Sequence, residues 1–228
     1  MKLKAFKAAF PITLPVLTGY LFLGIAFGLL MHQSGFPILW TFLSSSVVFA
    51  GALQFAGVSI LASAFNPLAA FTLAILVNIR HLFYGLSMLT RFKGLGFKKN
   101  FVIYMMADEA FSINAAAKIP EGVDSAWFYF FTSLLCYLYW NLASLTGHLV
   151  GEFIPSSIVG LDFVLTALFY ILFLNQWNVK AHRPYLLVGL FSTLISRLVL
   201  GRSNFLLGAM VLIIGLLWII PDQGVHHE

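Results

Sequence analysis

Charge is the property that this sequence has least of. Of its 228 residues, only 9% are charged and 61% are apolar, whereas a soluble domain has about 25% charged and about 45–50% apolar residues. No Asp, Glu, Lys or Arg occurs in the 72 residues 8–79, a length that holds three helical membrane spans of about 20 residues each. This shortage excludes a soluble enzyme and a disordered chain, and it predicts an integral membrane protein.

Cysteine is also scarce, because Cys136 is the single one in the chain, which excludes a disulfide scaffold. The apolar runs lack the polar alternation of transmembrane barrel strands. The net charge of +5 comes from short flanks beside apolar runs, where Lys and Arg mark the cytoplasmic side of a membrane, so we expect no nucleic-acid partner. The HExxH, P-loop and GxSxG motifs are absent, and we expect neither an enzyme nor a metal or cofactor site.

The apolar residues form eight segments. These segments span residues 10–31, 38–65, 67–90, 101–118, 126–151, 158–176, 184–201 and 204–220. The pattern predicts an all-α integral membrane protein, with about seven apolar helical segments and a short polar one at 101–118, in a single membrane transport domain over 1–228. Phenylalanines at corresponding places suggest an internal repeat with halves 1–118 and 119–228, an architecture typical of secondary transporters.

The distribution of basic residues conflicts with three simple crossings. If the first three segments all crossed, the N-terminal lysines and the basic loop 91–100 would lie on opposite sides, although the positive-inside rule places them together. Segment 38–65 is the best candidate for an incomplete crossing, because it contains Ser44, Ser45 and Ser46. We therefore expect broken or re-entrant helices there, and in 101–118 as well, buried in protein or lining a cavity.

Two adjacent carboxylates, Asp108 and Glu109, lie within an apolar stretch that has no cation within one helical turn. A charge at mid-membrane costs roughly 2.5–3.5 kcal/mol on insertion scales, so one carboxylate must pair, bind a proton or reach water. We expect these residues to couple transport to protons. The alternative is an interfacial amphipathic helix with both acids in water.

Other polar residues of the apolar segments are further candidates. Asn78 and His81 fall on one helical face, which predicts a polar surface for a substrate or a proton, while Arg80 points elsewhere and serves as a charge partner or snorkels at a helix end. Asp162 is either a proton-coupling acid that pairs with Arg80 or Arg197, or an acid at a helix N-terminus. Arg197 is otherwise a snorkelling residue.

The glycines of segment 38–65 predict a substrate site. Gly51 and Gly57 bracket Gln54, and together they favour a helix break whose backbone dipoles bind a zwitterion, since half-helix N-termini bind carboxylates. The alternative is a packed helix with a hydrogen-bonded Gln. A separate GxxxG pattern from Gly24 to Gly28 permits close helix packing.

Five motifs in order along the chain resemble the AzlC family, the large subunit of branched-chain amino acid exporters. They are FPITLPVLTGYLFLGIAFG at 10–28, FAGALQFAG at 49–57, NIRHLFYGLSM at 78–88, DEAFS at 108–112 and GLDFVLTALF at 160–169. The positions that match the family pattern are Gly51, Gln54, Asn78, Arg80, His81, Asp108, Glu109, Ser112 and Asp162.

The resemblance implies a multi-pass protein of the bacterial cytoplasmic membrane with a small hydrophobic AzlD-type partner subunit. It also implies export of leucine, isoleucine, valine or related amino acids such as methionine. The alternative is a channel or a structural membrane subunit with no ion-coupled transport of its own.

Overall fold

The structure is a computed structural model. It describes residues 1–62, 67–154, 166–167, 170, 173–174, 177–178 and 180–219, and within these ranges every regular element is helical. In this described part of the chain, three helices are long and apolar enough to cross a membrane: Lys2–Gln33, Ala70–Met88 and Arg183–Gly201. The predicted all-α membrane class is confirmed, whereas the number of apolar segments and the repeat of 1–118 with 119–228 remain predictions.

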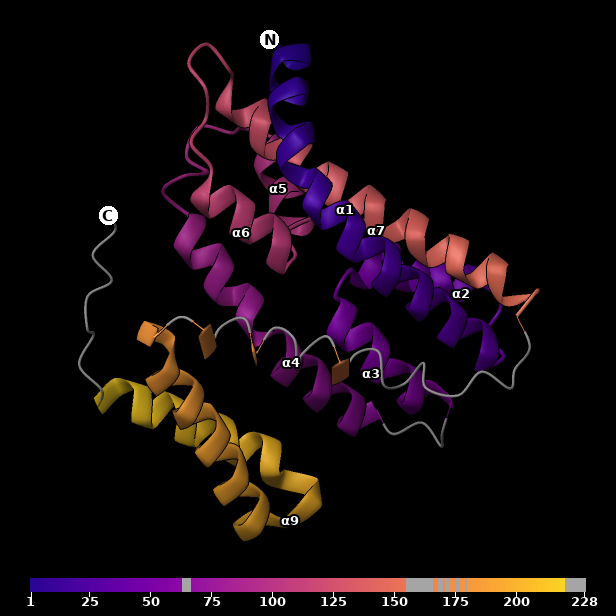
Figure 1. Cartoon of the computed structure of the whole chain (residues 1–228), viewed down its shortest axis with the longest axis vertical. Coiled ribbons are helices and arrows are strands. Elements are labelled where there is room, and N and C mark those ends of the chain that lie inside the picture. Colours follow the sequence, from indigo (N-terminus) through magenta and orange to yellow (C-terminus); the bar gives the residue numbers. More distant parts are fainter. Residues whose placement is uncertain are drawn as a thin grey trace. The chain divides into compact units, whose positions relative to one another are not determined.

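The longest packed pair is formed by α1 (Lys2–Gln33) and α7 (Ser125–Gly151), which run side by side (Figure 1). Their backbones touch through glycine. A Cβ added to Gly28 would lie 1.9 Å from the carbonyl oxygen of Ser144, and one added to Gly147 would lie 2.1 Å from that of Ile25. The GxxxG pattern therefore lies where the two helices approach most closely.

Helix α7 is about 40 Å long at 1.5 Å per residue. The contacts at its two ends show which of the other elements lie at each end of this helix. At its basic end, the ammonium groups of Lys2 and Lys98 lie 4.5 and 4.4 Å from the ring centre of Trp127. At its histidine end, Nδ1 of His148 lies 2.8 Å from the hydroxyl of Thr41. The N-terminal lysines and the loop before Lys98 thus share one end, as the positive-inside rule requires.

Within segment 38–65, residues 38–62 form a broken hairpin that enters from the histidine end. It consists of α2 (Ile38–Leu43), the π-helix η1 (Ser44–Val48) and α3 (Gly51–Ala62). Helix α3 returns toward the histidine end, where Leu61 and Met31 of α1 line one cavity. The interruption that the serines and glycines predict is present.

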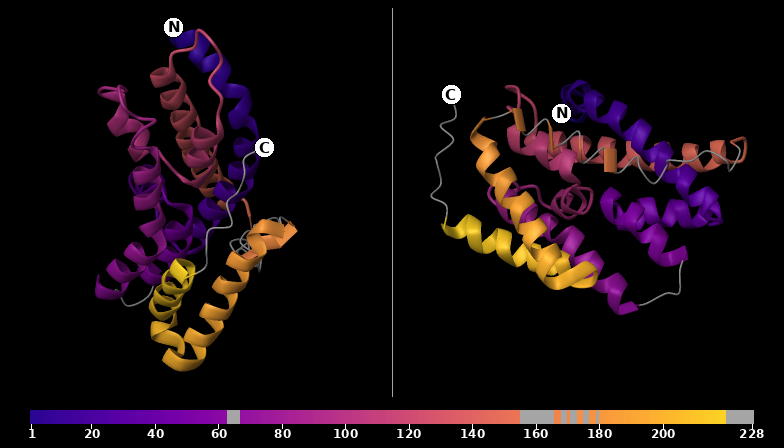
Figure 2. Two further views of the ribbon diagram at one scale, coloured as in Figure 1. Left: turned by 90° about the vertical axis from the view of Figure 1, so that its left-hand side faces the viewer. Right: turned by 60° about the horizontal axis from the view of Figure 1, so that its bottom comes forward.

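A second broken hairpin enters from the basic end. Helix α4 (Pro67–Met88) leads to it, and α5 (Lys98–Tyr104) and α6 (Asp108–Ala116) form its two arms. Helix α6 returns toward the basic end, where Lys118 and Ala8 of α1 line a cavity. The two hairpins therefore enter from opposite ends of α7 and meet between α1 and α4 (Figure 2).

The chain divides into two compact units, Met1–Leu165 and Thr166–Glu228. In the second unit, the 3-10 helix η2 (Lys180–His182) precedes α9 (Arg183–Ile219). Gly201 breaks α9 with φ 69° and ψ −166°, which turns it into two arms (Figure 2). This break falls between the predicted segments 184–201 and 204–220.

Candidate functional site

The tips of the two hairpins meet through the carbonyl groups of η1. The hydroxyls of Tyr104 and Tyr137 both donate to the carbonyl oxygen of Ser46, the latter at 3.0 Å. The side-chain amide of Asn141 donates to the carbonyl of Ser45 at 3.3 Å. An interrupted helix leaves carbonyls unpaired, and these three side chains provide the missing donors. The carbonyls of Ser45 and Ser46 are therefore satisfied by protein side chains, as irregular backbone at membrane depth requires, whereas the side chains of Val47 and Val48 are exposed.

The turn between η1 and α3 depends on one strained residue. Phe49 has φ 42° and ψ 47°, the left-handed conformation that costs a residue with a Cβ about 1–2 kcal/mol. Directly after it, Gly51 begins α3 against the indole ring of Trp140, where a Cβ would lie 3.1 Å from the nearest ring atom. Because the chain turns here, the buried residues Phe49 and Ala50 lead into the first turn of α3, whose residues Gly51–Leu53 are half-buried.

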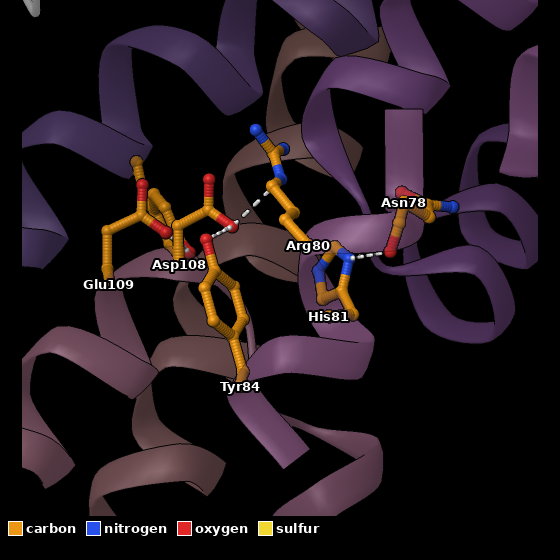
Figure 3. A network of polar contacts seen from close by, with 7 residues as sticks. Asn78, Arg80, His81, Tyr84, Asp108 and Glu109 are labelled. Carbon is orange, nitrogen blue, oxygen red and sulfur yellow. Dashed lines mark hydrogen bonds and ion pairs between the residues drawn. The ribbon is translucent and has the colours of Figure 1, made fainter. Parts of the chain in front are cut away.

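Asp108 and Glu109 occupy the first turn of α6, where the helix dipole favours negative charge. The carboxylate of Asp108 points toward Arg80 and Tyr84, as Figure 3 shows. Oδ1 of Asp108 lies 3.2 Å from Nε of Arg80 and accepts a hydrogen bond of 3.1 Å from Tyr84. The N–H of Arg80 Nε is not aligned for a hydrogen bond, so the contact is an ion pair. Arg80, which the sequence placed apart from Asn78 and His81, is thus the cation of Asp108.

Glu109 has a different environment. Its Oε2 accepts a hydrogen bond of 2.5 Å from the hydroxyl of Tyr20, which is itself buried. Helix α6 has nine residues and is too short to span a membrane. Burial raises the pKa of the Glu109 carboxyl, and the hydrogen bond from Tyr20 opposes this shift. The surroundings of Glu109 therefore favour its protonated form.

A cavity of about 260 Å³ lies beside the helix break and the acidic turn. Its lining residues are Val48, Phe49, Ala50, Asn78, His81, Ile103, Tyr104 and Met106. Asn78 Oδ1 is buried and has no hydrogen-bond partner among the described residues. Nδ1 of His81 lies 3.2 Å from the carbonyl of Asn78 (Figure 3). Drug-sized ligands occupy roughly 300–1,000 Å³, so this cavity, with one free acceptor, suits a smaller polar solute.

Gln54 and Gly57 lie away from this cavity. The side-chain oxygen of Gln54 accepts from the indole of Trp140 at 2.9 Å, and its nitrogen contacts the hydroxyls of Ser44 and Ser45 at 3.2 Å each. Gln54 is 4% exposed, and its polar atoms are engaged within the hairpin. Gln54 and Gly57 also line a second, apolar cavity.

The remaining predicted residues belong elsewhere. Arg197 lies in the second unit, with its guanidinium 5.4 Å from the ring centre of Phe205. Asp162 lies outside the described residues. Within the described ranges, no group of three His, Cys, Asp or Glu side chains is placed to hold a metal ion.

Sequence reasoning missed the tyrosines. Tyr20, Tyr84 and Tyr104 each donate to a polar group at the meeting point of the hairpins. A signal was available, because the chain has 24 Phe and only 8 Tyr. Where Phe is the usual aromatic residue, a Tyr in an apolar run indicates that its hydroxyl has a buried partner.

These features define a helical membrane protein in which two broken helices surround a small polar cavity. The family model described as AzlC protein matches residues 15–154, and the chain belongs to this family. It is 43% identical over 216 residues to the branched-chain amino acid transport protein AzlC of Bacillus subtilis, covering 95% of this chain and 85% of that protein.

Two further relatives are described as uncharacterized membrane proteins. The chain is 36% identical to one from Haemophilus influenzae, covering 91% of this chain and 86% of the relative. It is 34% identical to one from Helicobacter pylori (strain ATCC 700392 / 26695), covering 97% of each chain. No solved structure matches the chain. The comparisons support a membrane protein with a transport role.

Proposed function

We propose that the chain is the large subunit of a secondary transporter that exports branched-chain amino acids across the bacterial cytoplasmic membrane. Leucine, isoleucine and valine are the expected substrates, with methionine as a related one. The observation that carries this proposal is the polar cavity at a helix break, because substrate sites of secondary transporters lie at interrupted helices near the midplane. The 43% identity to a branched-chain amino acid transport protein supports the substrate class.

The proposed substrate site holds a zwitterion. The first amides of α3, from Gly51 onward, would bind the carboxylate, since a helix N-terminus favours an anion. The free Oδ1 of Asn78 would accept a proton of the ammonium group, with His81 on the same cavity wall. Gln54 would hold the break open through Trp140, and Gly57 would line the space beyond it.

We further propose that export is coupled to the proton gradient. Glu109 would bind and release the proton, because its half-buried carboxyl is hydrogen-bonded to a neutral hydroxyl rather than paired with a cation. Asp108 would take part in the coupling, because it is adjacent to Glu109 and its charge would interact with the change of charge on Glu109. Arg80 would be the charge partner of Asp108. Asp162 and Arg197 stay in the proposal as a further proton-coupling acid and charge partner, on the strength of their place in the sequence.

A small hydrophobic AzlD-type subunit is the proposed partner. This part of the proposal rests on the family resemblance. Co-purification of a tagged form of this chain with such a subunit from the same cells tests it, and a chain that transports at full rate without the subunit would contradict it.

The main experiment measures amino acid efflux after loading with dipeptides. A deletion strain is loaded with leucine-, isoleucine-, valine- or methionine-containing dipeptides, with and without this chain and its partner. We expect lower intracellular levels of these four amino acids when both proteins are present. Equal levels in the two strains would contradict the proposal.

The second candidate is a channel or a structural subunit, in which the carboxylates only position helix α6. The favouring observation is the ion pair of Asp108 with Arg80, which is also an ordinary structural contact. Efflux that saturates with internal leucine, together with leucine counterflow, supports a carrier. A linear, non-exchanging flux supports a channel.

A further inference from the structure

A second cavity of about 290 Å³ lies on the histidine-end side of the helix break. Its walls come from α1, η1, α3 and α4, and most of them are aliphatic. The lining residues are Met31, Ser44, Val48, Leu53, Gln54, Gly57, Val58, Ile60, Leu61, Ala70, Leu73 and Ala74. Val48 lines this cavity and the polar one. Val48, which is 44% exposed, therefore belongs to the walls of both cavities.

The amide of Gln54, the largest polar group of the second cavity, is engaged within the protein. Its side-chain nitrogen donates to the hydroxyl of Ser44 at 3.2 Å, and its oxygen is bonded to Trp140. Most of the remaining lining is aliphatic. Such a compartment stabilises an alkyl group by about 0.8 kcal/mol per buried CH₂.

We propose that this cavity is the subsite for the aliphatic side chain of the transported amino acid, and that Gly57 determines which side chains fit. The inference rests on the proposed function and adds the basis of its specificity. The zwitterionic part would lie on the polar side of Val48, and the branched alkyl part on the apolar side. In this arrangement the charged groups of the amino acid contact polar residues, and its alkyl side chain contacts aliphatic residues.

Gly57 is the position at which the size of this subsite is set. A Cβ added to Gly57 meets nothing within 4 Å, and the residue lines the cavity, so a larger side chain would enter the open space. Gly28, in contrast, is fixed by backbone contacts to α7. Substitution of Gly57 therefore changes the cavity without forcing the helices apart.

The test compares Gly57→Val with Gly19→Val in proteoliposomes that contain this chain and its partner. Gly19 is an exposed helical glycine with nothing within 4 Å of an added Cβ, which makes it a matched control. One added methylene in an apolar pocket changes discrimination by roughly 10-fold or more. We expect Gly57→Val to lower kcat/KM for leucine at least about 10-fold relative to alanine, and Gly19→Val to leave this ratio unchanged.

The outcomes separate the two levels of the proposal. If the unsubstituted protein transports no branched-chain amino acid, the proposed function itself fails. Suppose instead that the unsubstituted protein transports leucine. The side-chain subsite is then refuted if Gly57→Val lowers leucine and alanine transport equally, or if it lowers neither. An equal loss is the result expected if a lipid acyl chain fills the cavity.

A second inference comes from the spacing of the helices. Helix α3 begins at Gly51 and α6 begins at Asp108, 57 positions later. The sequence Phe27-Gly28-Leu29 with Met31 has its counterpart in Tyr84-Gly85-Leu86 with Met88, again 57 positions later. Each of these motifs lies in the crossing helix that precedes a broken hairpin.

We infer that residues 14–62 and 71–119 are two copies of one unit with inverted topology. Each unit contains a crossing helix followed by a broken hairpin, and the two hairpins enter from opposite ends of α7. This repeat is shorter than the predicted halves, and all of it except residue 119 lies within the first of them. Inverted units of this kind exchange conformations during alternating access, so opening of one hairpin would accompany closure of the other.

Single cysteines at Leu61 and Lys118 test this exchange, because the two positions are 57 apart. Leu61 lies at the outer end of α3, and Lys118 lies just beyond the outer end of α6. The native Cys136 is first replaced by Ala. We expect saturating leucine to change their rates of modification by a membrane-impermeant thiol reagent in opposite directions. Rates that change together, or that do not change, would refute the exchange.

Discussion

The hydroxyl of Tyr20 lies 2.5 Å from Oε2 of Glu109, while the neighbouring Asp108 contacts Arg80 instead. Two carboxylates that are adjacent in sequence therefore have partners of different charge. Asp108 is compensated by a guanidinium from α4, and Glu109 faces a buried hydroxyl from α1. Because of this difference, we expect substitutions of the two acids to have different effects.

The stability of the protein should depend on pH through Glu109. Its pKa is raised by burial, so the folded state retains the proton to higher pH than the unfolded chain does. The stabilising contribution is complete below the unfolded pKa and is lost as pH rises through the folded pKa. Glu109→Gln should therefore raise the thermal midpoint of the detergent-solubilised protein at mildly alkaline pH and leave it unchanged at acidic pH. A shift of equal size at both pH values would contradict this, and Glu121→Gln, in an exposed turn, is the control.

The Arg80–Asp108 pair should show coupling in a double-mutant cycle. Arg80→Gln leaves the carboxylate without its cation, and Asp108→Asn leaves the guanidinium without its anion, so each single variant contains an uncompensated charge. The double variant R80Q/D108N contains none. We expect the double variant to lose less in thermal midpoint than the two single variants lose when their losses are added. Strictly additive effects would show that the two side chains do not interact.

Gln54 should be important for stability. Gln54→Leu leaves the buried indole N–H of Trp140 without its acceptor, which costs about 1–3 kcal/mol. Denaturation in detergent should show this loss. Gln33→Leu is the control, because the Gln33 side-chain nitrogen has no hydrogen-bond partner. Equal midpoints for Gln54→Leu and the unsubstituted protein would contradict this role of the hydrogen bond to Trp140.

The contact between α1 and α7 should tolerate no added methyl group. Gly28→Ala places a Cβ against the carbonyl of Ser144, and such overpacking costs about 1–3 kcal/mol. Gly85→Ala in α4 meets nothing within 4 Å and should stabilise the protein by about 0.5–1 kcal/mol, because alanine favours helix over glycine. Thermal unfolding of both variants in the same detergent measures the difference, and similar midpoints would contradict the close packing.

The sequence contained enough to predict the class of protein and the interrupted segment. The shortage of charge identified the membrane, and the position of the basic residues required an incomplete crossing near Ser44–Ser46, where the π-helix lies. Asn78 and His81 were placed on one face by helical periodicity, and both line the polar cavity.

Other features depend on tertiary contacts that periodicity does not report. The cation of Asp108 comes from a helix 28 positions earlier, and the partner of Glu109 comes from 89 positions earlier. Gln54 was predicted to bind the solute, a role that remains a proposal, but its hydrogen bonds are to Trp140 and two serines. Such pairings follow from the way the hairpins pack against α1, α4 and α7.

Leucine movement driven by a pH gradient tests the central claim, that Glu109 couples transport to protons. The measurement uses proteoliposomes with this chain and its partner subunit, and compares Glu109→Gln with Glu121→Gln. We predict that Glu109→Gln abolishes gradient-driven leucine accumulation and retains leucine counterflow, while Glu121→Gln behaves as the unsubstituted protein does. Gradient-driven accumulation at the normal rate in Glu109→Gln would contradict the account.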